Sequence, residues 1–109
     1  MSDTSSFLPK AAESLQKQLS SELEITEVAS PPTSEYEDLV QWLTPYITRL
    51  LDHHFEKLLQ LLYRVDVSEN LFKEAIGQPN SDHIASSIAR LIIDRQIQKM
   101  QIRAKYSHF

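Results

Sequence analysis

The feature that most constrains this chain is one long run in which apolar residues recur at steps of three and four. The run extends from Thr44 to Val65. Its seam consists of Ile47, Leu51, His54, Leu58, Leu61 and Val65. This spacing is typical of a helix that packs on other helices. The seam is widened by Leu50, Phe55, Leu59 and Leu62. The pattern therefore predicts a central core helix that begins at Thr44 and Pro45, a pair typical of a helix start.

The composition favours an all-α protein, folded as a small helical bundle. There is one glycine among 109 residues, and the hairpins of sheets need residues that tolerate positive φ. No cysteine is present, which excludes disulfides, thiolate metal sites and cysteine nucleophiles. The chain also lacks a signal-peptide start and a run of about eighteen apolar residues. The expectation is a cytoplasmic protein without a membrane segment.

The N-terminal third differs in character from the rest of the chain. Residues 1–33 are predicted to form a partly disordered tail, and residues 34–109 a helical bundle domain. Within the tail, residues 10–25 are expected to form an amphipathic helix, followed by a proline-rich linker at 27–34. Because its apolar stripe is too narrow to hold a helix alone in water, the segment either docks loosely on the bundle or orders on a partner. The stripe consists of Ala11, Leu15, Leu19 and Leu23.

Start and stop signals divide the bundle domain into four helices. Pro45 has no backbone N–H, so we expect a break or a sharp kink at Thr44; one kinked helix over 35–64 is the alternative. The expected ranges are roughly 35–43, 45–64, 68–76 and 83–105, the last helix being long for a small domain.

Three further signals concern the ends of these helices. Residues 66–69 have the form of a capping box, in which Asp66 would accept from the first turn of the next helix. Gly77 is expected to end that helix in the left-handed conformation. The last helix is expected to be capped by Asn80, Ser81 or Asp82.

The last helix changes its apolar face along its length. In its first half, one face carries Ile84, Ala85, Ile88, Leu91 and Ile92. In its second half, the same face carries Arg95, Lys99 and Arg103, and the apolar positions move to Ala89, Ile93, Ile97, Met100 and Ala104. The direction of burial therefore changes near Ile93, so the second half is expected to meet another element. The candidates are the N-terminal leucine stripe and the same helix of a second subunit.

Two segments carry a resemblance to a known group of proteins. They are LLQLLYRVDVSE at residues 58–69 and ARLIIDRQIQK at residues 89–99. Both resemble segments of a family of short, uncharacterised, all-helical bacterial proteins. The resemblance implies a helical fold for these stretches, and it implies no known activity and no catalytic or ligand residue.

No constellation of residues indicates an active site or a metal centre. Side chains of adjacent helical residues such as His53 and His54 point about 100° apart, so the two imidazoles cannot share one ion. His54 is instead expected to fill a seam position and His53 to be exposed, although His53 and Glu56 could supply two ligands. The further ligand candidates, which have no motif spacing, are Asp52, His83 and His108. We therefore expect no catalytic residue, no cofactor and no metal.

Charge is distributed unevenly along the chain. Residues 1–40 carry eight acidic and two basic side chains, whereas residues 84–109 carry one acidic and five basic side chains. Such an asymmetry is consistent with intramolecular docking, with head-to-tail association or with an acidic ligand. Pairing of the basic helix with the acidic residues 22–38 is one expected outcome.

Together these features predict a non-enzymatic helical interaction protein that self-associates through its C-terminal helix, as a homodimer, or binds another protein. The alternative is a weak nucleic-acid-binding protein that uses the basic stripe. The stripe has a simpler explanation, because cations suit the C-terminal end of a helix dipole. The expected contact surface consists of Ile93, Ile97 and Met100, flanked by Arg95, Lys99 and Arg103.

Overall fold

The computed structural model of the protein describes residues 4–22 and 28–106. Within these ranges there is no strand, which confirms the predicted all-α class and the long C-terminal helix. A 3-10 turn, η1 (Thr4–Phe7), leads into the first helix, and π-helical turns, η2 (Gln18–Glu22), follow it. The five α-helices are α1 (Leu8–Lys17), α2 (Tyr36–His53), α3 (Phe55–Val65), α4 (Glu69–Ile76) and α5 (Ser81–Tyr106). None of the helices described combines the length and the apolar character that a bilayer-spanning segment needs.

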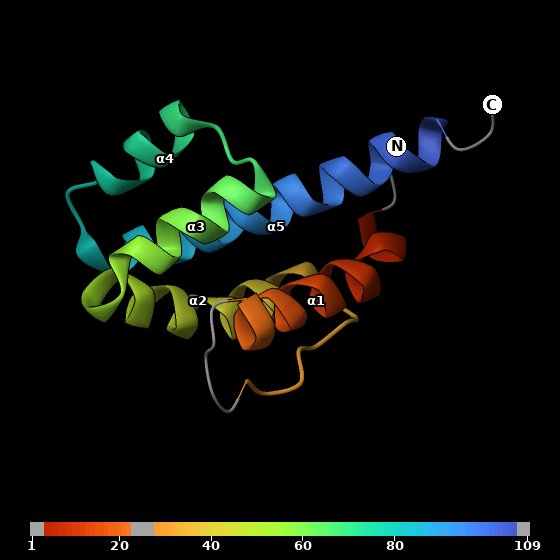
Figure 1. Cartoon of the computed structure of the whole chain (residues 1–109), viewed down its shortest axis with the longest axis horizontal. Coiled ribbons are helices and arrows are strands. Elements are labelled where there is room, and N and C mark those ends of the chain that lie inside the picture. Colours follow the sequence, from red (N-terminus) through yellow and green to blue (C-terminus); the bar gives the residue numbers. More distant parts are fainter. Residues whose placement is uncertain (1–3, 23–27, 107–109) are drawn as a thin grey trace.

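The last helix, α5, holds the centre of the fold. It contacts each of the other four α-helices, and Figure 1 shows it passing behind α3 and continuing beyond the end of α3. The predicted central position of the run 44–65 is therefore wrong. That run is divided between two helices, whereas α5 is long enough to pack against all of its neighbours. Its buried residues are Ala85, Ile88, Ala89, Ile92, Ile93, Gln96 and Ile97.

The helix α2 continues through Pro45, so the predicted break at Thr44 is wrong. Pro45 cannot donate to the carbonyl of Gln41, but both residues are exposed, so water can donate to that carbonyl instead. Thr44 does not cap a helix. Its hydroxyl donates to the carbonyl of Val40 at 2.7 Å, within the preceding turn.

The break occurs at His54, ten residues further along the chain than Thr44. His54 has φ −143° and ψ 56°, which is not helical, and it separates α2 from α3. Its side chain is exposed, so the predicted seam position for His54 is wrong. Because the helix direction changes here, the apolar pattern does not continue in register. Leu58 remains buried, whereas Phe55 and Leu59, which were expected to widen the seam, are exposed.

The end of α3 forms a Schellman motif around Asp66. Asp66 has φ 67° and ψ 49°, the left-handed conformation. The N–H of Val67 donates to the carbonyl of Leu62 at 3.0 Å, and the N–H of Asp66 donates to the carbonyl of Tyr63 at 3.2 Å. Aspartate tolerates this conformation better than most residues other than glycine.

Two predicted caps of α4 do not form, although the helix ends at Gly77 as expected. Ser68, not Asp66, occupies the N-cap position of α4, and no side-chain cap bond forms there. Gly77 has φ −76°, so it is not left-handed, and its N–H closes the last turn of α4 on the carbonyl of Lys73 at 3.0 Å. By contrast, α5 begins as expected, because the N–H of Asp82 donates to the Asn80 side chain at 2.9 Å.

The N-terminal helix belongs to the same core as the rest of the chain. Of the two expected alternatives, docking on the bundle is the one found, and the docking is close: the described apolar residues of α1 and η2 are at most 2% exposed. Across the contact with α5, the side-chain amide of Gln96 donates to that of Gln18 at 3.0 Å. Leu23 of the predicted stripe lies outside the described residues. The buried residues are Leu8, Ala11, Ala12, Leu15 and Leu19.

The proline-rich segment before α2 is held by two aromatic side chains of α2. The indole N–H of Trp42 donates to the carbonyl of Ala29 at 3.1 Å, and the N–H of Ala29 donates to the hydroxyl of Tyr46 at 2.9 Å. The two rings are 5.3 Å apart. The segment that begins at residue 28 is therefore pinned along α2.

We predict that Leu15→Ala lowers the free energy of unfolding by about 2–5 kcal/mol, because it leaves a cavity between α1 and the core. Lys17→Ala, at an exposed position of the same helix, should change it by no more than about 0.5 kcal/mol. Urea denaturation followed by circular dichroism measures both values. Equal, small effects of the two changes would mean that α1 does not share the core.

We also predict that Pro45→Ala raises the free energy of unfolding by about 1–2 kcal/mol. Alanine restores one backbone hydrogen bond, and inside a helix it stabilises the folded state by up to about 3 kcal/mol more than proline does. The unfolded chain is freer with alanine than with proline, which offsets about 1 kcal/mol of this gain. Pro45→Gly also restores the N–H, but glycine is a poorer helix former than alanine. Its free energy of unfolding should therefore be about 1 kcal/mol lower than that of Pro45→Ala. Thermal and urea unfolding provide the comparison. A destabilised Pro45→Ala protein would contradict this account of α2.

Candidate functional site

The helix α4 is the least embedded α-helix of the described chain. Only one of its eight residues, Ala75, is buried. A hollow flanks it on each side, one towards α3 and one towards α5. The turn of residues 66–68 borders both hollows. This region is therefore the candidate site.

The first hollow, which we call the α3–α4 groove, is predominantly apolar. Its volume is about 650 Å³. The rings of Phe55 and Phe72, 6.4 Å apart, form a further contact between the two helices. Acidic and basic side chains come only from the turn and from α4. The lining residues are Leu59, Leu62, Tyr63, Asp66, Val67, Ser68, Glu69, Phe72 and Lys73.

Large apolar side chains are exposed on the two helices that border this groove. Phe55, Leu59 and Tyr63 are 43%, 41% and 90% exposed, and their spacing by four places them on one face of α3. Of the seven exposed large apolar or aromatic residues in the described chain, five lie on α3 and α4. Single exposed apolar side chains are ordinary, but a concentration of them is typical of an interaction site. The five are Phe55, Leu59, Tyr63, Leu71 and Ile76.

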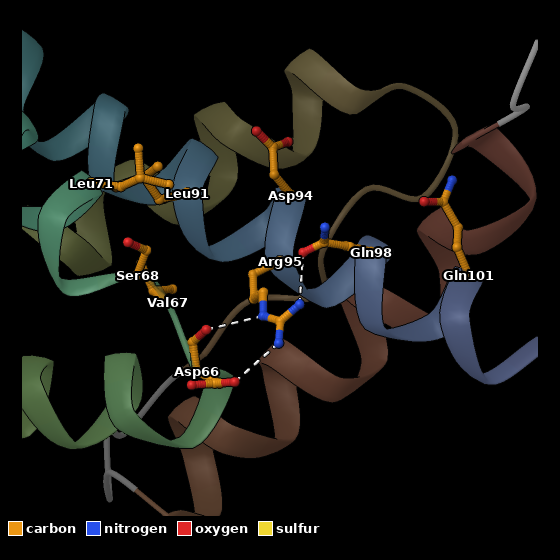
Figure 2. A pocket seen from close by; sticks show the side chains of 9 residues that line it. All are labelled: Asp66, Val67, Ser68, Leu71, Leu91, Asp94, Arg95, Gln98 and Gln101. Atoms are coloured by element: carbon orange, nitrogen blue, oxygen red, sulfur yellow. Dashed lines mark hydrogen bonds and ion pairs between the residues drawn. The ribbon is translucent and has the colours of Figure 1, made fainter.

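The second hollow, the α4–α5 cleft, has a volume of about 620 Å³ and a more polar lining, drawn in Figure 2. Arg95 is its organising residue. The guanidinium donates to the Asp66 carboxylate and to the Asp66 carbonyl, each at 3.0 Å, and to the Gln98 side chain at 2.6 Å. Arg95 thus places a positive charge at the C-terminal end of α3, where the helix dipole favours it, and ties the turn to α5.

The cleft borders a second polar cluster, which joins the start of α2 to α5. The Tyr36 hydroxyl donates to the Asp94 carboxylate at 2.6 Å, and Arg90 donates to both oxygens of Glu37 at 2.6 and 2.9 Å. The Arg90 guanidinium also lies 5.9 Å from the centre of the Tyr36 ring. The expected pairing of the basic helix with acidic residues of the segment 22–38 is therefore confirmed for Glu37.

These contacts shift the acid–base properties of the cluster. Burial of Tyr36, together with its hydrogen bond to Asp94, raises the pKa of Tyr36 well above its ordinary value of 10.0. The hydrogen bonds from Arg90 lower the pKa of Glu37, and the same bonds raise the pKa of Arg90. The cluster therefore keeps Tyr36 neutral and Glu37 charged at neutral pH.

The apolar residues expected to form a contact surface lie inside the chain. Ile93 and Ile97 are 0% and 4% exposed, and Met100 is half-buried against the core. Their face is covered by α1, the first of the two candidates that the changing pattern of the last helix suggested. This corrects the expected position of the contact surface, because residues in the core of one chain cannot contact a partner without opening that chain.

The three cations expected beside that surface are separated by their contacts. Arg95 binds Asp66, as described above. The Lys99 ammonium donates to the carbonyls of Arg64 and Val65 at 3.5 and 3.4 Å, so it also meets the C-terminal end of α3. Arg103 is exposed and lines a separate hollow of about 600 Å³ against α1. The stripe is therefore not one continuous basic surface.

The exposed face of α3 was not identified as a site from the sequence. The spacing of Phe55, Leu59 and Tyr63 is visible in the sequence, but it indicates only that the three share a helix face. Whether another element covers that face depends on the direction in which the turn at residues 66–68 sends the chain. No apolar pattern in the sequence predicts that direction. The sequence therefore indicates which residues share this face of α3, but it does not indicate that the face is exposed.

The suggested metal ligands are not brought together. In the parts of the chain that the structure describes, no three His, Asp or Glu side chains lie close enough to hold an ion. His53 and His54 are exposed at the break between α2 and α3, and His83 is exposed at the start of α5. His108 lies outside the described residues.

We predict that Tyr36→Phe lowers the free energy of unfolding by about 1 kcal/mol at pH 8, through loss of a hydrogen bond to a carboxylate. The folded state raises the pKa of Tyr36, so its contribution is complete below pH 10.0 and is lost as the pH rises further. The difference between the two proteins should therefore shrink from pH 8 to pH 11. Urea midpoints across this range measure it, and a constant difference would contradict the assignment.

Comparisons with known proteins do not place this chain in a family. Protein-family models, curated proteins and solved structures each gave no match to it. The resemblance to short, uncharacterised bacterial proteins stays a prediction.

Proposed function

We propose that this protein is a non-enzymatic interaction module that binds an apolar helical segment of a protein partner in the α3–α4 groove. The observation that carries the proposal is the exposed apolar face of α3, formed by Phe55, Leu59 and Tyr63, beside that predominantly apolar groove. An amphipathic helix that lays its apolar face into such a groove is a common mode of peptide recognition.

The lining supports a protein segment over a small polar ligand. Small-molecule sites combine an apolar pocket with a few buried polar groups that orient the ligand. Here the charged side chains, Asp66, Glu69 and Lys73, are all exposed. The one buried polar residue of the described chain, Gln96, does not line the groove.

The weak embedding of α4 supports the same proposal. Beyond Ala75, its C-terminal end is held through Gln78, whose side-chain amide donates to the Ser87 hydroxyl at 2.8 Å and to the Ala75 carbonyl at 3.1 Å. An element with few buried contacts can shift at low cost in free energy. The groove can therefore adjust its width to a bound helix.

The basic stripe gives less support to the nucleic-acid alternative. Phosphate binding depends on clustered cations that exchange their counterions for the nucleic acid. Arg95 and Lys99 instead meet carbonyl and carboxylate oxygens at the end of α3. We therefore favour a protein partner.

A photoreactive phenylalanine analogue at position 63 tests the proposal. Tyr63 lines the groove and is 90% exposed, so the replacement leaves the core unchanged. In cells that make the protein, irradiation should yield covalent adducts to a protein, identified by mass spectrometry. The matched control places the same analogue at Gln60, which is exposed on α3 outside the groove.

A second change sharpens the result. Leu59→Lys in the groove should reduce the yield of the position-63 adduct at least about tenfold. It places a charge among apolar side chains, which should weaken binding by more than about 1.4 kcal/mol. Adducts of equal yield from positions 60 and 63, or adducts insensitive to Leu59→Lys, would refute the groove as the binding site.

A further inference from the structure

The remaining exposed large apolar or aromatic side chains of the described chain lie at the end of α5. Ile102 and Tyr106 are 46% and 61% exposed. Their spacing by four places them on one face of the helix, and Arg103 and Lys105 lie on either side of that face. The end of α5 is thus an amphipathic segment with an apolar face and basic flanks.

The same face of α5 is covered as far along the helix as Lys99. Leu91 and Arg95 lie in the cleft against the turn of residues 66–68, and Lys99 meets the last carbonyls of α3. Beyond Lys99, α3 has ended, and Figure 1 shows α5 continuing past it. The exposure of Ile102 and Tyr106 therefore follows from the difference in length between the two helices.

This basic, apolar segment is complementary to the α3–α4 groove. The groove is apolar and its charged lining comprises two acidic residues and one basic residue. Asp66 is already paired with Arg95, so Glu69 is the carboxylate of the lining that remains for a cation of an incoming helix; Lys73, the basic lining residue, lies one turn further along α4. From residue 95 to residue 106 the described part of α5 carries four basic and no acidic side chains.

The segment cannot reach the groove of its own chain. Arg95 contacts Asp66 at the end of the groove, and Ile102 lies seven residues further along the same unbroken helix. At 1.5 Å per residue this displaces Ile102 by about 10 Å and Tyr106 by about 16 Å, away from the groove. An occupant with this chemistry has to come from another molecule.

We propose that the end of α5 of a second copy of this chain, residues 99–106, docks in the α3–α4 groove. Ile102 and Tyr106 contact Leu59, Tyr63 and Phe72, and Arg103 or Lys105 faces Glu69. The inference rests on the proposed function of the groove as a site for an apolar helix. Each molecule offers one groove and one helix end, so the interface is heterologous and joins copies head to tail.

The contact involves about two turns of helix, so it falls at the small end of protein interfaces. We therefore expect dissociation constants on the order of 10–1,000 μM, and a weight-average mass that rises with concentration above the monomer mass. The monomer mass is 12.6 kDa. Added salt should weaken the association, because part of it is attraction between exposed charges.

Sedimentation velocity of the full chain and two variants tests the proposal. The groove variant combines Leu59→Lys with Tyr63→Lys, and the tail variant is Ile102→Glu; each should remain monomeric alone. Mixed in equal amounts, they should form a dimer and nothing larger, because only one groove and one helix end in each pair remain intact. The controls are Gln60→Lys on α3 and Gln41→Glu on α2, at exposed positions outside the groove, and both should associate like the unmodified chain.

Several outcomes overturn the inference. A chain that stays monomeric at about 1 mM, or a mixture that forms no dimer, excludes docking of α5 in the groove of a second copy. Tyr63→Ser replaces the groove variant if the latter loses cooperative unfolding. The position-63 adduct separates the two proposals: an adduct with a different protein retains the groove as a binding site, whereas no adduct removes both.

Discussion

The burial of α5 among all four other α-helices is the interaction on which the rest of the structure depends. Ile88, Ile92 and Ile93 are fully buried, and each such side chain contributes about 1.5–3 kcal/mol when it leaves water. No other helix of the described chain could supply this core, because α1, α3 and α4 are short and α2 packs mainly on α5 itself. The N-terminal helix, separated from α2 by a proline-rich segment, belongs to the same core for this reason.

Basic side chains along α5 then set where its neighbours end and begin. Arg90 binds the first turn of α2 through Glu37, whereas Arg95 and Lys99 meet the end of α3. Exposed ion pairs contribute at most about 1 kcal/mol each, so these contacts add little to stability. Their effect is on the course of the chain: they fix the position of the turn at Asp66, after which α4 begins.

The candidate site is a consequence of that turn. The left-handed Asp66 ends α3 and sends the chain into a short helix, of which only Ala75 is buried. The helix α4 thus stands beside α3 without covering its apolar face, and a groove remains between them. The end of α5 is exposed for a related reason, since α5 continues past the end of α3. The two proposals, a groove for an apolar helix and its occupation by a second copy, join these two uncovered surfaces.

The sequence alone determined the helices whose limits are set by local chemistry. The last helix was expected at 83–105 and is found at Ser81–Tyr106, and α4 was expected at 68–76 and is found at Glu69–Ile76. Helical periodicity acts within a few positions of the chain, as does the Asn80 cap of α5, so a single sequence records them. The two caps predicted for α4 do not form, so its limits follow from periodicity. Only the tertiary structure decided that Pro45 is accommodated, that His54 breaks the helix and that Phe55 and Leu59 face solvent while Ile93 and Ile97 do not. Periodicity defines a face, but which face is covered depends on packing between residues that are distant in sequence.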